Sequence, residues 1–158
     1  MFNLLSCARE ALEILSPAVE VLFGHSEKDG FHFIILNPVF ERWNVKGDIE
    51  GAILLDGFIG NDDEKHNYRE IALSKVEQAW MVGMSNAFVQ SFAPALLKEK
   101  DTPYAGSFVY NGLVVAVSGL QPWFDELVSM WIACTIQQVC QHQRQRWIAR
   151  HPTEDFFS

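Results

Sequence analysis

Hydrophobic residues in the middle of the chain form two short β-rich runs, residues 108–110 and 113–117, separated by Asn111 and Gly112. An Asn-Gly pair suits the two positive-φ positions of a type I′ turn, so the pattern predicts a tight hairpin. Pro122 follows within a few residues and can open a helix, because a first-turn residue needs no backbone N–H partner. The stretch therefore predicts a strand, a turn, a strand and a helix.

The N-terminal region has a different periodicity. Apolar residues recur at three- and four-residue spacing through residues 2–15, which predicts an amphipathic helix. The pair Ser16-Pro17 predicts that this helix is kinked or restarted. Residues 31–36 and 51–58 are short apolar runs, and they predict two strands that pair as a hairpin with a long connection.

Two helical stripes separate these strands from the central hairpin. A capping-box pattern at residues 61–64 precedes the first stripe, which keeps helical period through Met84. The second stripe runs from Phe88 to Leu97 and is made irregular by Pro94. After the hairpin, the polar run 137–146 predicts that the last helix continues beyond the core.

These elements predict an α+β fold in the order α-β-β-α-α-β-β-α, with an antiparallel sheet of four to five strands flanked by helices. The apolar face expected for the last helix contains Phe124, Leu127, Val128, Trp131 and Thr135, with Ile132 and Val139 on its flank. The length of 158 residues fits one domain, residues 1–150, with a C-terminal tail at 151–158.

Composition adds two constraints on partners. Aromatic residues make up 13% of the chain, including twelve Phe and five Trp, which is more than one small core readily holds. The surplus favours a subunit surface or an aromatic-lined pocket. The formal net charge of −8 argues against nucleic acid and anionic membranes as partners, because binding to them needs clustered Lys and Arg.

Cysteines and the N-terminus indicate the compartment. The three cysteines are odd in number and have no CxxC spacing, so they are expected to be reduced thiols in a cytoplasmic protein. The N-terminal stretch has no basic region ahead of its apolar residues, so no signal peptide is expected. No apolar run approaches the 18 or so residues of a membrane span.

Several polar residues could carry chemistry. Glu10 and Glu13, at i and i+3, share a helix face and could hold a metal ion, and His66 and Glu70 have the i, i+4 spacing of two metal ligands. A solvated helix face explains both pairs more simply. His32 lies in an apolar strand, where a hydrogen-bonded core histidine is the favoured interpretation. No acid, base and nucleophile converge, so catalysis is not expected.

Two segments resemble a known family. Residues 54–57, followed by Ile71 to Ala79, resemble the "L-x-x-x-D-G … I-A-x-x-K-A-x-x-A" portion of the GlcG/HbpS-type, haem-binding-protein-like family. Residues 110–119 with Asp125 are similar to that family's "D-G-x-x-V-G-A-I-G-V-S-G … D" hairpin and helix start. The chain departs from the family at residues 37–47, a long insertion where the family has a short turn.

The resemblance covers residues 31–135 and implies a profilin-like layout and assembly into homo-oligomers. Several members of the family bind haem or related small molecules. With that layout, His66 and Tyr68 at a helix start and Tyr104 and Ser107 before the hairpin would line a ligand cleft. In the alternative, Tyr104 packs against the hairpin and nothing binds.

The leading hypothesis is therefore a cytoplasmic, non-enzymatic small-ligand-binding or sensory domain that forms a homo-oligomer. Its cofactor is unknown, and haem is implied by the resemblance alone. The competing hypothesis is a homo-oligomeric protein–protein interaction or structural module without a small-molecule ligand. The same fold would serve either role, since fold alone does not determine function.

Overall fold

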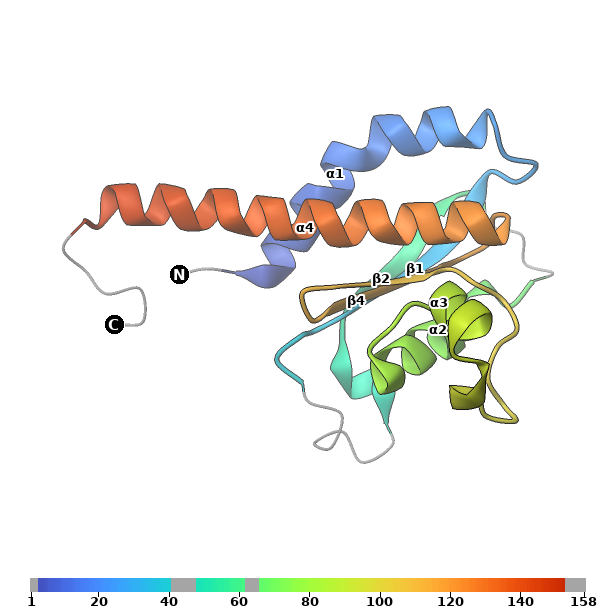
Figure 1. Cartoon of the computed structure of the whole chain (residues 1–158). Coiled ribbons are helices and arrows are strands. Elements are labelled where there is room, and N and C mark those ends of the chain that lie inside the picture. The colour runs from blue at the N-terminus through green and yellow to red at the C-terminus, as the bar shows by residue number, and fades with distance from the viewer. Residues whose placement is uncertain (1–2, 41–47, 62–65, 153–158) are drawn as a thin grey trace.

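The computed structural model describes residues 3–40, 48–61 and 66–152. These residues form a four-stranded antiparallel sheet in the order β2-β1-β4-β3, with helices on both faces (Figure 1). The predicted α+β class and the predicted order of helices and strands are confirmed. The elements are α1 (Leu4–Phe23), β1 (Gly30–Leu36), β2 (Ile53–Gly60), α2 (Tyr68–Val82), α3 (Asn86–Phe92), β3 (Ser107–Tyr110), β4 (Leu113–Ser118) and α4 (Pro122–Arg150), with short 3₁₀ turns η1 (Ile49–Ala52) and η2 (Pro94–Leu96).

The β3–β4 hairpin has the predicted turn. Asn111 and Gly112 both have positive φ, at 49° and 81°, as a type I′ turn requires. β4 pairs on its other side with β1, so that His32 lies opposite Ser118. β1 also pairs with β2 over its whole length, as the predicted first hairpin required.

Side chains of β1 alternate between two cores, one on each face of the sheet. Phe31, Phe33 and Ile35 pack under α1 and α4. Ile34 and Leu36 pack under α2 on the opposite face. Because successive strand residues point to opposite faces, one strand contributes to both cores. The sheet therefore holds α2 and the segment after it on one side of the molecule, away from α1 and α4 (Figure 1).

The first two predicted boundaries differ from the structure. α1 is one helix with Pro17 inside it, so the restart, one of the two predicted outcomes, does not occur. Its apolar face packs on α4, and this packing compensates for the hydrogen bond that proline cannot donate. β2 begins at Ile53 instead of residue 51, because Ile49–Ala52 form a 3₁₀ turn capped by the Asp48 side chain.

α2 begins at Tyr68, and residues 62–64 of the predicted capping box (61–64) lie outside the described residues. Gly83, with φ of 79°, ends α2, and the Ser85 side chain then caps α3. Pro94 begins η2, where the sequence predicts an irregular helix.

α4 is 29 residues long, and its C-terminal half projects past the sheet while crossing α1 (Figure 1). The continuation through the polar run is confirmed. The buried face differs from the predicted one because it contains two polar residues, Asp125 and Ser129, which a hydrophobicity pattern assigns to solvent. The buried apolar residues of this face are Val128, Ile132, Ala133, Ile136 and Val139.

Candidate functional site

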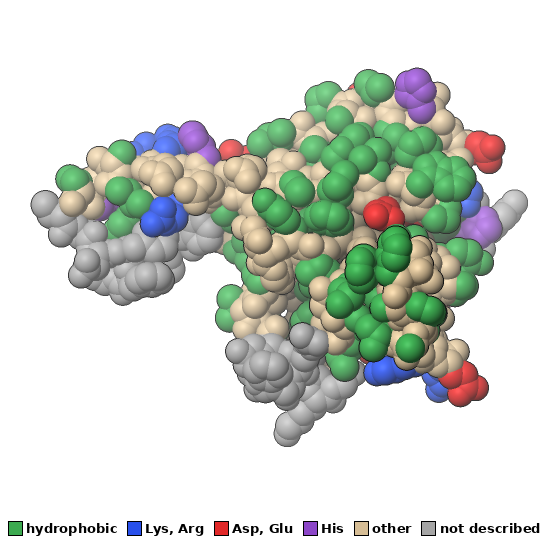
Figure 2. Space-filling view, viewed as in Figure 1, with side chains coloured by type: hydrophobic (Ala, Val, Ile, Leu, Met, Phe, Trp, Pro, Cys, Tyr) green, Lys and Arg blue, Asp and Glu red, His purple; other side chains and the backbone are tan. Residues whose placement is uncertain are grey.

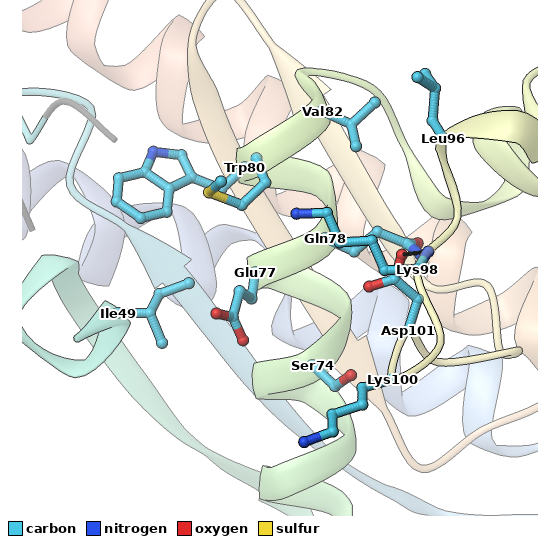
Figure 3. Close-up of a pocket in the computed structure, with 11 residues that line it drawn as sticks. Ile49, Ser74, Glu77, Gln78, Trp80, Val82, Leu96, Lys98, Lys100 and Asp101 are labelled. Carbon is cyan, nitrogen blue, oxygen red and sulfur yellow. Dashed lines mark hydrogen bonds between the residues drawn. The ribbon is translucent and has the colours of Figure 1, made fainter. Parts of the chain in front are cut away.

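A cavity of about 410 Å³ lies against the outer side of α2, between that helix and the loop that follows η2. Figure 3 shows α2 as one wall, with Leu96, Lys98 and Asp101 contributed from across the gap. Volumes of this order are typical of sites for small organic ligands. The remaining residues that line it are Ile49, Ser74, Glu77, Gln78, Trp80, Met81, Val82 and Lys100.

The cavity has an apolar wall and a polar rim. Trp80 and Met81, together with Leu96 opposite them, give a surface that an apolar ligand body can contact. Lys98 and Lys100 are exposed on the loop. The Asp101 carboxylate accepts a hydrogen bond of 2.7 Å from the backbone N–H of Lys98, which closes this loop.

Behind the cavity, α2 carries a buried ion pair. Lys75 Nζ lies 2.9 Å from Asp125 Oδ2 and also donates to the carbonyl oxygen of Val117. The second oxygen of Asp125 accepts from the backbone N–H of Leu120. Desolvation raises the pKa of Asp125 to about 6, against the opposing effect of Lys75. The pair joins α2 to the start of α4 through the sheet.

Gly106 is the backbone position that makes room for this pair. Its φ is 146°, and a Cβ built there would lie 2.6 Å from Lys75 Nζ and 2.8 Å from Asp125 Cβ. The carbonyl of Gly106 also accepts a hydrogen bond from the Ser129 hydroxyl on α4. A residue with a side chain at position 106 would therefore displace the ion pair.

Asn86, just after α2, connects the ion pair to the cavity. Its Nδ2 donates to the Lys75 carbonyl at 3.0 Å and to Gln78 Oε1 at 2.6 Å. The backbone N–H of Asn86 donates to the Ser107 hydroxyl at 2.9 Å. Gln78 is 4% exposed and lines the cavity, and its Nε2 has no hydrogen-bond partner among the described residues.

The predicted ligand residues His66 and Tyr68 lie together at the start of α2. Their rings stack with centroids 5.3 Å apart. Tyr68 is buried, and its hydroxyl accepts a hydrogen bond from Lys28 Nζ, which also lies over the tyrosine ring. These contacts fix the beginning of α2 to the segment before β1.

The other two predicted residues lie elsewhere. Ser107 is fully buried, and its hydroxyl accepts from the backbone N–H of Asn86, whose side chain donates to the carbonyl of Lys75 in the middle of α2. Tyr104 is 54% exposed on the loop before β3. The structure brings His66 and Tyr68 together but does not place Ser107 beside them, and none of the four residues lines the cavity over α2.

A charged cluster at the start of α2 has a structural role. Arg69 donates to both carboxylate oxygens of Glu50, at 2.9 and 2.8 Å, and to Asp56 Oδ2 at 2.9 Å. The hydrogen bonds that Glu50 accepts from Arg69 lower the pKa of the Glu50 carboxyl group. His32 Nε2 lies 3.8 Å from the same Asp56 oxygen, so the strand histidine sits on the face of the sheet that carries α2.

Metal chemistry finds no support in the described parts of the chain. They contain no group of three His, Cys, Asp or Glu side chains placed to hold a metal ion. Glu10 and Glu13 are exposed on α1, and Glu10 accepts a hydrogen bond from Gln143 of α4. Over residues 3–40, 48–61 and 66–152, no helix has the length and apolar character needed to cross a membrane.

The cavity offers few of the side chains that ligate haem iron. Among the described residues that line it, Met81 is of this kind, while His, Cys and Tyr are absent. No protein-family model, curated protein or solved structure matches this chain.

Sequence reasoning did not identify the residues of the cavity. Lys75 and Gln78 lie within the helical period of Ala72, Val76 and Ala79, which places them on or beside the buried face of α2. Their position on the apolar face could have marked these two residues, because a polar side chain that is buried needs a hydrogen-bond partner. Lys98 and Lys100 reach the site through a loop, for which periodicity gives no signal.

Proposed function

We propose that this chain is a cytoplasmic, non-enzymatic small-ligand-binding domain, and that the cavity over α2 is its ligand site. The observation that carries the proposal is the cavity itself, about 410 Å³ in volume, with Trp80 and Leu96 on its apolar wall and Gln78 as a buried polar group. This combination of apolar walls and a few oriented polar groups is typical of small-molecule sites.

The two segments that resemble the GlcG/HbpS-type family support the same proposal. Lys75 belongs to the first segment and Asp125 to the second, and their side chains form the buried ion pair. In this arrangement the ion pair stabilises α2, and α2 forms the floor of the cavity.

A thermal-shift screen tests the proposal. A ligand that binds only the folded protein must raise the melting temperature, by an amount that grows with its concentration. The panel contains small organic acids, amines, neutral aromatics and haemin. If no compound raises the melting temperature of the folded wild-type protein, the proposal is wrong.

A cavity-filling variant locates the binding. Ser74 lines the cavity, so Ser74→Trp is expected to abolish the shift caused by a compound that binds there. Gln138→Trp places the same bulk on the exposed surface of α4 and is expected to leave the shift unchanged. A shift that survives Ser74→Trp would place the ligand elsewhere on the molecule.

A second candidate function, a homo-oligomeric interaction module, is favoured by exposed aromatic side chains on α3. Phe88 and Phe92 are 46% and 76% exposed, and their rings lie 5.3 Å apart. Figure 2 shows hydrophobic side chains gathered over this part of the molecule. Light scattering across a concentration series compares the wild type with Phe88→Ser/Phe92→Ser. An unchanged average mass would exclude α3 as the contact surface.

A further inference from the structure

We infer that the outer edge of β2, with the groove beside it, binds an extended peptide segment of a partner protein, apolar at alternate positions and flanked by lysine or arginine. The inference goes beyond the proposed small-molecule site, which lies on the opposite face of the sheet. Two independent features lead to it: the direction of the β2 backbone groups and an apolar groove under α1.

β2 is an outer strand of the sheet and pairs only with β1. The backbone N–H of Val117 in β4 donates to Gly106, just before β3, so the neighbouring residues of β4 turn their backbone groups toward β1. Carrying this alternation across the register of β1 directs the N–H and C=O groups of Asp56 and Phe58 outward. Among the described residues, neither backbone has a hydrogen-bond partner beyond the sheet.

This edge lacks the features that usually prevent pairing with another strand, such as short length, proline or lysine. β2 has eight residues and contains neither proline nor lysine. Its one charged side chain, Asp56, is compensated by Arg69 at 2.9 Å, and the register shift opposite Leu36 affects only its start. β3, at the opposite edge, has only four residues. The outer side of β2 is therefore the edge suited to receive another strand.

A groove with a volume of about 510 Å³ lies beside this edge, between α1 and the sheet. It is lined by apolar side chains from α1, β1 and β2, which are Leu12, Val19, Phe33 and Ile59. α4 covers β3 and β4 on the same face and packs against α1, so the groove opens toward β2 (Figure 1). A strand paired with β2 turns every second side chain toward this face, where apolar side chains can enter the groove.

The charges around the groove favour a cationic partner. Glu13 is the one charged residue among those that line it, and Glu20 lies on the same side of α1; both are exposed. α1 as a whole contains three carboxylates and one cation, Arg9. On the other face of β2, Arg69 is bonded to two carboxylates, so that side also has an excess of negative charge. Lysine or arginine beside the apolar positions of the bound segment complements both faces.

A labelled octapeptide of alternating valine and threonine, with lysine at each end, tests the inference by fluorescence anisotropy. We expect saturable binding that is about tenfold weaker when glutamate replaces both lysines. A version with proline in the middle should not bind, because proline has no N–H to donate to the edge. Absence of saturable binding, or equal affinity of the glutamate version, would overturn the inference and leave the proposed small-molecule function standing.

Hydrogen exchange locates the bound peptide. Pairing with β2 should slow exchange of the amide N–H groups of Asp56 and Phe58, which point away from β1 in the protein alone. Unchanged exchange at these two amides in the presence of saturating octapeptide would contradict the inference. If both amides are already protected without peptide, and the average mass is that of a dimer, a second copy occupies the edge and the assignment to a peptide partner is wrong.

Two matched pairs of variants test the residues. Phe58→Pro removes an N–H that points outward, whereas Phe58→Val also loses the ring but keeps this donor, so only the proline variant should lose the octapeptide.

Ser16→Lys adds a cation to the exposed rim of the groove and should weaken binding of the lysine-ended octapeptide severalfold. Gln138→Lys adds the same charge on exposed α4 and should leave the affinity unchanged. If Phe58→Pro does not fold, this second pair decides: equal affinities of Ser16→Lys and Gln138→Lys would overturn the inference.

Discussion

At the scale of single residues, the Lys75–Asp125 pair is the most consequential contact in the protein. Both side chains are almost fully buried, and each contributes to the hydrogen bonding of the other. Replacing one partner leaves a buried charge without compensation, which typically costs about 3–5 kcal/mol. We therefore expect Lys75→Met to lower the free energy of unfolding by about that amount, measured by urea denaturation at pH 7.

The double variant Lys75→Met/Asp125→Asn separates the charge from the packing. Asparagine keeps an oxygen for the Leu120 backbone N–H but removes the unpaired charge, so part of the lost stability should return. Lys98→Met, an exposed lysine, should change stability little. A double variant no more stable than Lys75→Met alone would show that the ion pair does not cause the loss.

The same pair predicts a pH dependence. Burial raises the pKa of Asp125 from 3.8 to about 6, although Lys75 and the backbone N–H of Leu120 act in the opposite direction. Between pH 4 and 6 the folded state therefore binds more protons than the unfolded chain, so this residue makes the free energy of unfolding fall as the pH rises through that window.

Comparison with Asp125→Asn isolates this effect, since asparagine does not titrate. We expect the wild type to lose stability relative to Asp125→Asn between pH 4 and 6, measured by urea denaturation at several pH values. Parallel stability curves for the two proteins would contradict the assignment of the raised pKa to Asp125.

At the scale of elements, the β3–β4 hairpin shows a local sequence determining a local structure. Gly112 has φ of 81°, and a Cβ at this position would meet nothing within 4 Å. The cost of Gly112→Ala is therefore purely conformational, and we expect a loss of about 1 kcal/mol. Gly51 is equally open but has no positive φ, so Gly51→Ala should be neutral or slightly stabilising in the same thermal unfolding experiment. Equal effects of the two changes would refute this explanation.

The elements also show why some features could be predicted and others could not. The hairpin and the start of α4 depend on Asn111, Gly112 and Pro122, whose conformational preferences act locally. The buried face of α4 was predicted only in part, because Asp125 is buried through its pairing with Lys75, which lies 50 positions away in the chain. A hydrophobicity pattern assigns a carboxylate to solvent, and only the tertiary fold reverses that assignment.

At the scale of the whole molecule, the class and the order of elements were predictable because each element carries its own pattern. The cavity over α2 was not predictable, because it lies between α2 and a loop about twenty residues later in the chain. Sequence periodicity carries no information about such a contact. The predicted cleft assumed that the start of α2 and the residues before β3 share one edge of the sheet. In the structure, Ser107 contacts Asn86, whose side chain bonds the Lys75 carbonyl about two turns along α2 from Tyr68.

Charge is unevenly distributed over the whole molecule. Residues 142–151, at the end of α4, contain three Arg, two His and no carboxylate, although the chain has a formal net charge of −8. The other 148 residues therefore carry −11. This basic end projects beyond the sheet, and Figure 2 shows Lys and Arg side chains on it. A basic projection on an acidic body favours contact between copies of the chain.

If such contacts supply the expected homo-oligomer, self-association must depend on salt. We expect the average mass from light scattering to fall toward that of the monomer as NaCl rises from about 0.05 to 0.5 M, because screening over this range shortens the reach of the attraction. Arg146→Glu/Arg150→Glu should lower the mass at low salt. Arg9→Glu/Lys100→Glu on the body changes the net charge equally and should lower the mass less. A mass independent of salt, or equal effects of the two double variants, would exclude the end of α4 as the contact.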